Sequence, residues 1–176
     1  ADITPESLVW RLKRESDKFW ASDARQAKLK ALGMSAYEVM TRASIVHEET
    51  NVKEEMPRIA GVYINRLKRG MLLQADPTLK YAVGDPTIRR VLDRHKSVES
   101  PYNTYKYAGL PPAPINVPPK ACLDAVLNPD THGYIYFCAS AAFDGTHKFA
   151  VGYTEHMKNA RAFQRELTAR RRAQKA

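Results

Sequence analysis

The sequence predicts a mostly helical α+β domain with a small antiparallel β element. Apolar residues recur at helical spacing over most of the 176 residues, and capping residues mark where many of these segments begin and end. Only two short segments in the last third of the chain have the composition and length of strands. A chain of this length can bury a sizeable core, so we expect residues 1–176 to form a single domain.

Two helices are expected to lead into this domain. Thr4 supplies a capping hydroxyl, and Pro5 suits the first turn of the first helix. A second short helix, or a continuation of the first, covers residues 23–32 and stops at Gly33. Residues 1–33 are therefore predicted to be a helical lead-in.

A helical hairpin is expected next. Ser35 and Glu38 form a capping box for a helix that ends at Glu49. Glu54 and Glu55 fall in the first turn of the following helix, where carboxylates interact favourably with the helix dipole. We expect the two helices to run antiparallel, which would bring Glu49 and Glu55 near one another.

The middle of the chain changes character. Residues 76–83 predict a short helix that stops at Gly84, and residues 85–95 favour a helix followed by extended chain. The proline-rich segment 100–119 excludes regular helix. A loop of this length within a compact domain is often functional, and its prolines lower the entropic cost of holding one shape.

The last third predicts a helix, a β-hairpin and a long final helix. The helix covers residues 120–127, and the strands are Tyr134–Ala139 and His147–Val151. Thr154 is expected to cap the final helix, and residues 165–176 form a basic tail.

The net charge of +9 indicates an anionic partner, such as nucleic acid, a membrane surface or an acidic polymer. Part of this charge lies in the basic tail, for which a solvated surface is the simplest interpretation. No apolar run approaches the roughly 20 residues of a membrane span, and no signal peptide is evident. Because the chain begins abruptly at Ala1, we interpret it as a fragment or a processed form.

The two cysteines, Cys122 and Cys138, are expected to be buried thiols beside apolar residues. A disulfide remains an alternative in an oxidising compartment, because spacing alone does not exclude it. Neither a C-x-x-C motif nor a histidine and cysteine cluster is present, so we expect no metal and no cofactor.

The segment Ala43–Thr50, ASIVHEET, carries the strongest candidate for catalysis. Ile45 and Val46 precede Glu49 by four and three residues, which places its carboxylate at the edge of a buried helix face. A carboxyl group against apolar surface retains its proton more readily and can act as a general acid. The alternative is a solvated glutamate at a helix end.

The proline-rich loop carries aromatic and amide side chains suited to a sugar polymer. Tyrosine rings stack on pyranose rings, and amide and hydroxyl groups form hydrogen bonds with sugar substituents. The candidates are Tyr102, Asn103, Thr104, Tyr105 and Asn116. The alternative is that the tyrosines fill the core with their hydroxyl groups satisfied.

Three further polar residues are weaker candidates. Gln74 and Asp76 could face the same cleft, although we favour an N-cap role for Asp76. Glu55 either orients the site or caps its helix, and we favour the structural role. The histidines, including His147 and His156, are scattered with no serine or cysteine nucleophile signature nearby, so a hydrolytic triad has little support.

Taken together, the motifs resemble the MltG/YceG family of endolytic murein transglycosylases. The resemblance covers nearly the whole chain, beginning with Phe19-Trp20 and Arg25. Its stronger motifs, in order, are Ala43–Thr50, Val62–Leu67, Gly70–Thr78, Ser100–Tyr105, Gly109–Pro112 with Ile115, Gly145–Phe149 and Glu155-His156.

This resemblance implies a lysozyme-like, soluble-lytic-transglycosylase-like catalytic domain. The family's catalytic glutamate directly precedes a threonine, which corresponds to Glu49 here. The implied reaction cleaves the β-1,4 bond between N-acetylmuramic acid and N-acetylglucosamine within a glycan strand. Glu49 would protonate the leaving oxygen and then deprotonate the muramoyl C6 hydroxyl, which closes on C1 to give a 1,6-anhydro end.

The resemblance also implies a setting. The partners would be peptidoglycan glycan strands and, in addition, wall-synthesis proteins. The protein would be located at the periplasmic face of the inner membrane. An N-terminal anchor and a small LysM-like module of the family are absent from this sequence. His47, Ala113 and Pro118-Pro119 also depart from the family pattern and bear on the shape of the cleft.

Three alternative functions follow from the residues. A muramidase would use water as the nucleophile with help from Asp76 or Glu55, and it would release reducing ends. An inactive glycan-binding module would bind without cleavage. A nucleic-acid-binding domain would show steep salt dependence, and we expect no nucleic-acid partner.

Overall fold

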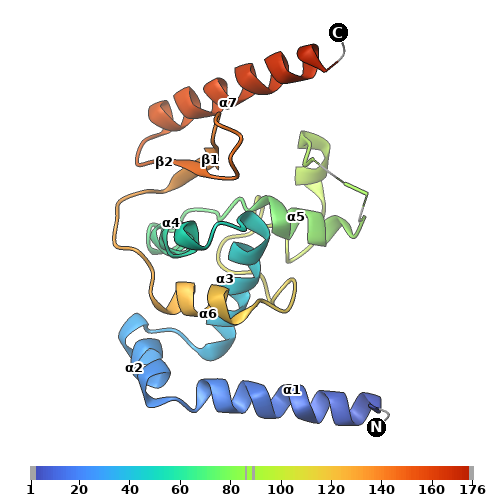
Figure 1. Cartoon of the computed structure of the whole chain (residues 1–176), viewed down its shortest axis with the longest axis vertical. Helices are drawn as coiled ribbons and strands as arrows, with labels where there is room; N and C mark the ends of the chain where they lie inside the picture. Colours follow the sequence, from blue (N-terminus) through green and yellow to red (C-terminus); the bar gives the residue numbers. More distant parts are fainter. Residues whose placement is uncertain (1–2, 86, 89, 175–176) are drawn as a thin grey trace.

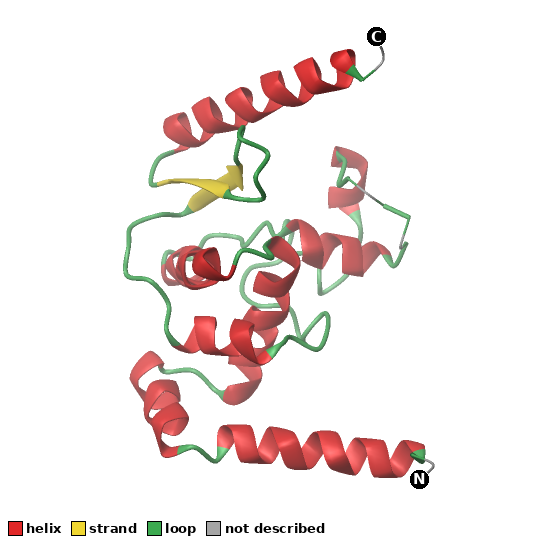
Figure 2. Ribbon diagram, viewed as in Figure 1, coloured by secondary structure: helices red, strands yellow, loops and turns green. Residues whose placement is uncertain are grey.

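The computed structural model describes residues 3–85, 87–88 and 90–174, and it is mostly helical with one small antiparallel sheet (Figures 1 and 2). The α+β class predicted from the sequence is therefore confirmed. The elements are α1 (Pro5–Trp20), α2 (Asp23–Leu32), α3 (Ala36–Glu49), α4 (Met56–Lys68), α5 (Asp76–Val83), α6 (Lys120–Leu127), β1 (Tyr136–Ala139), β2 (His147–Ala150) and α7 (Tyr153–Ala173). Helices α1 and α7 lie at opposite ends of the molecule, with α3 to α6 between them (Figure 1).

The N-terminal helices begin and end where their capping residues predict. The Thr4 hydroxyl accepts a hydrogen bond from the Ser7 N–H at the start of α1. Ser35 and Glu38 form the expected capping box of α3. Gly33 ends α2 with a φ of 63°, a left-handed conformation that glycine adopts without strain.

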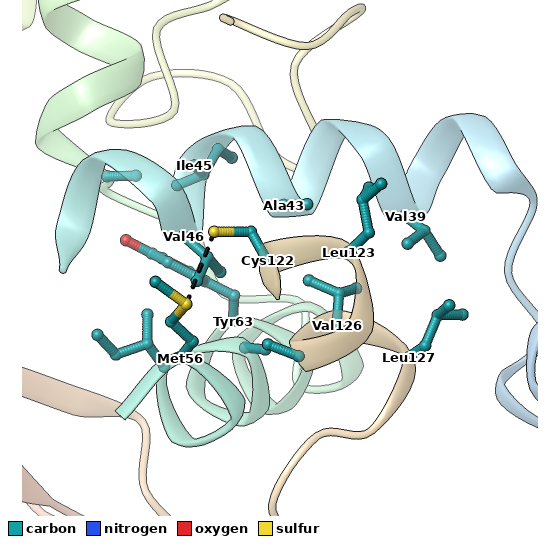
Figure 3. Packing of buried hydrophobic residues seen from close by; sticks show 14 of the residues in the cluster. Val39, Ala43, Ile45, Val46, Met56, Tyr63, Cys122, Leu123, Val126 and Leu127 are labelled. Carbon is teal, nitrogen blue, oxygen red and sulfur yellow. Dashed lines mark hydrogen bonds between the residues drawn. The ribbon is translucent and has the colours of Figure 1, made fainter. Parts of the chain in front are cut away.

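The core lies where α3, α4 and α6 pack together (Figure 3). Val39 and Val46 of α3 are fully buried against Cys122 and Val126 of α6. Each such aliphatic side chain contributes on the order of 1.5–3 kcal/mol by leaving water. This packing holds the C-terminal end of α3, which carries Glu49, in a fixed position.

Helices α3 and α4 do not form the expected antiparallel hairpin. Helix α4 is seen nearly end-on in Figure 1 while α3 runs upright in the plane of the view, and Figure 3 shows the same steep crossing. A short 3-10 turn over Lys53–Glu55 separates the two helices and redirects the chain. The antiparallel prediction is therefore wrong, and the crossing brings the middle of α4 beneath the end of α3.

The β-hairpin is antiparallel, with Phe137 opposite Phe149 and Ala139 opposite His147. Both strands are shorter than predicted, because the ladder begins at Tyr136 and ends at Ala150. Helix α7 packs on this hairpin.

Helix α7 begins one residue before the threonine that was expected to cap it. Gly152 occupies the N-cap position and Thr154 lies inside the first turn, so the predicted Thr154 cap is wrong. The helix continues to Ala173, so most of the predicted basic tail is helical.

Residues 85–95 differ from their prediction. The Asp85 side chain accepts hydrogen bonds from the N–H and hydroxyl of Thr87, a local turn that competes with helix formation. The helical part comes later, as a 3-10 turn over Asp93–Ser97, so the predicted order of helix then extended chain is wrong. Pro86 and Arg89 lie outside the described residues.

The proline-rich segment 100–119 forms a loop without regular structure, as predicted. Its start is fixed to the preceding turn, because the Asn103 amide donates to the carbonyls of Lys96 and Val98. In the part of the chain that the structure describes, no helix combines the length and apolar character of a membrane-spanning segment.

Candidate active site

Two adjoining hollows share Glu49 as part of their walls. One has a volume of about 500 Å³ and runs toward Phe143 and the turn between the strands. The other has a volume of about 480 Å³ and extends past Asp76 toward α7. His147 and Ala139 also line both hollows, so together they form a groove with Glu49 near its middle. A groove of this extent suits a linear ligand of several units.

Glu49 is the last residue of α3 and is partly buried. Burial raises the pKa of its carboxyl group to about 7, the hydrogen bond from Tyr63 opposes the shift, and the Asp76 carboxylate adds to it. A carboxyl group with such a pKa is substantially protonated near neutral pH. It can therefore serve as a general acid and, after losing its proton, as a general base.

The Tyr63 hydroxyl donates a 2.6 Å hydrogen bond to Oε1 of Glu49. Burial and the neighbouring Glu49 raise the pKa of Tyr63 well above its usual value, so Tyr63 remains the donor. Because Oε1 accepts this bond, the proton of neutral Glu49 belongs on Oε2. Tyr63 thus fixes which oxygen of Glu49 carries the acidic proton.

Asp76 and Tyr105 form the wall of the second hollow beside Glu49. The Tyr105 hydroxyl donates to Oδ1 of Asp76 at 2.5 Å, and burial together with this bond raises the pKa of Tyr105. The favoured N-cap role of Asp76 is wrong, because Ala75 occupies the N-cap of α5 and no side chain caps that helix.

Arg66 anchors the floor of the groove at its hairpin side. Its buried guanidinium donates to the carbonyls of Leu72 and Ile135 and to Oε1 of Gln74. Gln74 has a φ of 50°, a left-handed conformation that is uncommon outside glycine. Its backbone N–H donates to the Thr104 carbonyl, so two contacts hold this strained residue at the groove.

Glu55 does not cap α4, although it occupies the N-cap position. Its buried carboxylate instead holds His147, accepting from the backbone N–H at 2.9 Å and contacting the ring Nδ1 at 2.8 Å. The capping interpretation of Glu55 is therefore wrong, and its carboxylate holds His147 in place.

Four of the residues predicted to contact a sugar do not line the groove. Asn103 and Thr104 are almost completely buried, and their polar atoms bind the protein itself. Tyr102 packs against Tyr81 with ring centroids 4.6 Å apart. The Asn116 amide donates to Ser44 and Glu48 and ties the loop to α3.

For Asn103 and Thr104 the prediction of direct contact is therefore corrected. Both hold the loop in place, and Thr104 holds the backbone of Ala75 and Gln74 beside the groove. Of the six residues predicted to bind the ligand, Gln74 and Tyr105 lie with Glu49 along the groove.

Sequence reasoning missed several groove residues, among them Tyr63, Arg66, His147 and His156. Tyr63 and Arg66 were hidden in the buried helical pattern of α4. His147 alternates with Phe149 on one side of β2, and a histidine on the inner face of a strand was an available signal. His156 stacks on Tyr136, and burial followed by the charge of Arg66 lowers its pKa.

Both cysteines are free thiols. Cys122 is buried with Sγ 3.7 Å from Sδ of Met56, and Cys138 is a half-buried thiol at the groove. Among residues 3–85, 87–88 and 90–174 no three histidine, cysteine or acidic side chains converge as a metal site would require.

Comparisons with known proteins agree with this arrangement. The chain is 34% identical over 157 residues to the endolytic murein transglycosylase of Bacillus subtilis (strain 168), covering 89% of this chain and 42% of that protein. It is 29% identical over 160 residues to the endolytic murein transglycosylase of Streptococcus pneumoniae (strain ATCC BAA-255 / R6), covering 89% of this chain and 28% of that one. The chain thus spans less than half the length of these curated relatives.

A solved structure has the same fold. The crystal structure of a yceG-like protein from Listeria monocytogenes superposes with a TM-score of 0.79 at 34% sequence identity, covering 90% of this chain and 50% of that chain. The model of the YceG-like family matches residues 1–162. With the family model matching nearly all of the sequence, the chain belongs to the YceG-like family.

Proposed function

We propose that this chain is the catalytic domain of an endolytic murein transglycosylase that cleaves peptidoglycan glycan strands. The observation that carries the proposal is Glu49, which stands in the middle of a groove with its pKa raised to about 7. The names of the relatives from B. subtilis and S. pneumoniae support the same activity.

Glu49 acts first as the acid. A glycan strand lies along the groove so that the oxygen of one β-1,4 bond approaches Oε2 of Glu49. Transfer of the proton to this oxygen releases the N-acetylglucosamine side while positive charge develops at C1 of N-acetylmuramic acid. The carboxylate left behind is stabilised by the Tyr63 hydroxyl, which already donates to Oε1.

Glu49 then acts as the base. Its carboxylate removes the proton of the muramoyl C6 hydroxyl, whose oxygen closes on C1 to form a 1,6-anhydro ring. Because the nucleophile belongs to the substrate, a second catalytic carboxylate is not required. The product leaves, and Glu49 is again protonated for the next cycle.

The charge of the chain and the proposed location of the activity are both consistent with a peptidoglycan substrate. Peptidoglycan carries carboxylates, and the chain has a net charge of +9. The activity belongs on the periplasmic face of the inner membrane, where a full-length protein with an anchor would meet nascent strands and the wall-synthesis proteins.

A muramidase is the second candidate, because Asp76 places another carboxylate in the same hollow as Glu49. In that mechanism water attacks C1 and the product has a reducing end. The hydrogen bond from Tyr105 occupies Oδ1 of Asp76, which argues for a supporting role over a catalytic one. Glu55 is buried and bound to His147, so it is not available to help.

The experiment is mass spectrometry of purified glycan strands digested with this chain and with Glu49→Gln. We expect 1,6-anhydro ends from the wild type and at least about a 100-fold decrease in the variant, since general acid–base catalysis typically contributes 10²–10⁴-fold. Reducing ends would establish the muramidase. Strands that are bound but not cleaved would indicate a glycan-binding module.

A further inference from the structure

Beneath the groove lies a buried carboxylate whose only described side-chain partner is a histidine. Glu55 is 7% exposed, and a carboxylate removed from water to this extent requires hydrogen bonds. Both of its oxygens bind the same residue, since Oε1 accepts from the His147 backbone N–H and Oε2 contacts Nδ1 of the ring. The pair fixes the position and the rotation of the imidazole together.

This contact also fixes the tautomer of His147. A carboxylate only accepts hydrogen bonds, so Nδ1 carries a proton, and in the neutral ring Nε2 is left as an acceptor. Among the described residues Nε2 has no hydrogen-bond partner, yet it is not one of the buried atoms that lack a partner. Nε2 is therefore not fully buried, although the His147 side chain as a whole is only 13% exposed.

His147 lies in the same groove as Glu49. The ring lines both hollows, as Glu49 does, and the two residues come from different elements, β2 and α3. Phe137 packs edge-on against His147 at 5.5 Å and against Tyr63 at 5.9 Å between centroids. The ring of Phe137 thus lies between His147 and Tyr63, the hydrogen-bond partner of Glu49.

We propose that His147 is a positioning residue for the sugar bound at Glu49, and that Glu55 holds it for this task. Nε2 accepts a hydrogen bond from a hydroxyl or acetamido N–H of that sugar, which orients the ring for proton transfer from Oε2 of Glu49. Correct orientation at the reacting bond is a large part of enzymatic rate enhancement. This inference deepens the proposed function and rests on it.

Two variants of the same residue separate this role from a structural one. In His147→Asn the amide nitrogen can replace Nδ1 and keep the bond to Glu55, but nothing replaces Nε2. In His147→Gln the longer amide can replace Nε2 at the groove, while Glu55 keeps only the backbone N–H. A positioning role therefore predicts better activity in His147→Gln, and a structural role predicts better activity in His147→Asn.

The experiment measures kcat/KM for anhydro-end formation together with thermal unfolding, for the wild type, Glu49→Gln and both His147 variants. We expect His147→Asn to unfold near the wild-type temperature while losing about 10- to 100-fold in kcat/KM, the equivalent of one hydrogen bond in the transition state. His147→Gln should unfold at a lower temperature than His147→Asn but retain a higher kcat/KM.

Activity of His147→Asn equal to the wild type would overturn the inference and leave the proposed function intact. The same holds if activity follows unfolding temperature in both variants. A wild-type chain that forms no anhydro ends would overturn the proposed function itself, and the inference with it.

Discussion

The hydroxyl of Tyr63 and the carboxyl group of Glu49 are joined by a hydrogen bond of 2.6 Å, between the middle of α4 and the last residue of α3. The bond exists because the two helices cross steeply (Figure 3). It opposes the effect of burial, which raises the pKa of Glu49 to about 7. The balance leaves an acid that releases and regains its proton near neutral pH.

Tyr63→Phe should shift the pH profile of the enzyme. The Tyr63 bond favours the charged form of Glu49, so its removal raises the pKa of Glu49 further above about 7. Because the free enzyme needs protonated Glu49, the limb of kcat/KM that falls with rising pH should move to higher pH. The measurement is the pH dependence of anhydro-end formation, with Tyr107→Phe, which lies outside the groove, as the unshifted control. An unshifted limb in Tyr63→Phe would argue against the bond.

The raised pKa of Glu49 should make the fold less stable as pH rises. Between the ordinary value of 4.5 and about 7, the folded state binds more protons than the unfolded state, so the free energy of unfolding falls over this window. The decrease from this residue is on the order of 3 kcal/mol. Glu49→Gln removes it, so the variant should gain stability relative to the wild type on going from pH 4.5 to pH 8 in denaturant titrations. Parallel curves for the two proteins across this range would contradict a raised pKa.

Gly61→Ala should destabilise the fold where α4 meets the segment before β1. A Cβ atom at Gly61 would lie 2.6 Å from Nε2 of His132 and 2.7 Å from the Asp130 carbonyl, and that backbone oxygen cannot easily shift. We expect a loss of about 1–3 kcal/mol or more in the free energy of unfolding. Gly133→Ala is the matched control, because its Cβ would make only an ordinary contact at 3.7 Å. Equal stability of the two variants would show that the segment is not packed so tightly.

Thr104→Val should act on stability, in contrast to Tyr105→Phe. The Thr104 hydroxyl accepts from the buried Ala75 N–H and bonds the Thr78 hydroxyl. Valine leaves the Ala75 N–H without this acceptor, at a cost of about 1–3 kcal/mol, while the Thr78 hydroxyl keeps its bond to the Ala75 carbonyl. Tyr105→Phe removes only the bond to Asp76 at the groove, so it should alter glycan cleavage more than unfolding. Chemical denaturation and the cleavage assay on both variants test this division, and a stable Thr104→Val with weakened glycan binding would reverse it.

The helices and the place of Glu49 could be predicted because they depend on local signals. Capping residues and the spacing of Ile45 and Val46 ahead of Glu49 are properties of a few neighbouring residues. The partner of Glu49 could not be predicted in this way, since Tyr63 reaches it only through the crossing angle of two helices. That angle follows from side-chain packing over the whole core.

The contacts of the proline-rich loop 100–119 also could not be predicted from local sequence. The composition of the loop predicts contact with a ligand, yet Asn103 and Thr104 are buried. The prediction failed because a proline-rich loop has no periodicity from which inner and outer side chains could be told apart. His147 was passed over for a similar reason. The ring of His147 is held by Glu55, which lies ninety-two positions earlier in the chain. The local sequence around either residue gives no indication of this contact.

The most direct test of the account is a titration of the Glu49 side-chain carboxyl carbon by ¹³C NMR, assigned by comparison with Glu49→Gln. We predict that this carboxyl group titrates near pH 7, well above the 4.5 of an ordinary glutamate, and that it titrates higher still in Tyr63→Phe. A midpoint near 4.5 would mean that Glu49 is ionised at neutral pH, and the proposed acid would be wrong.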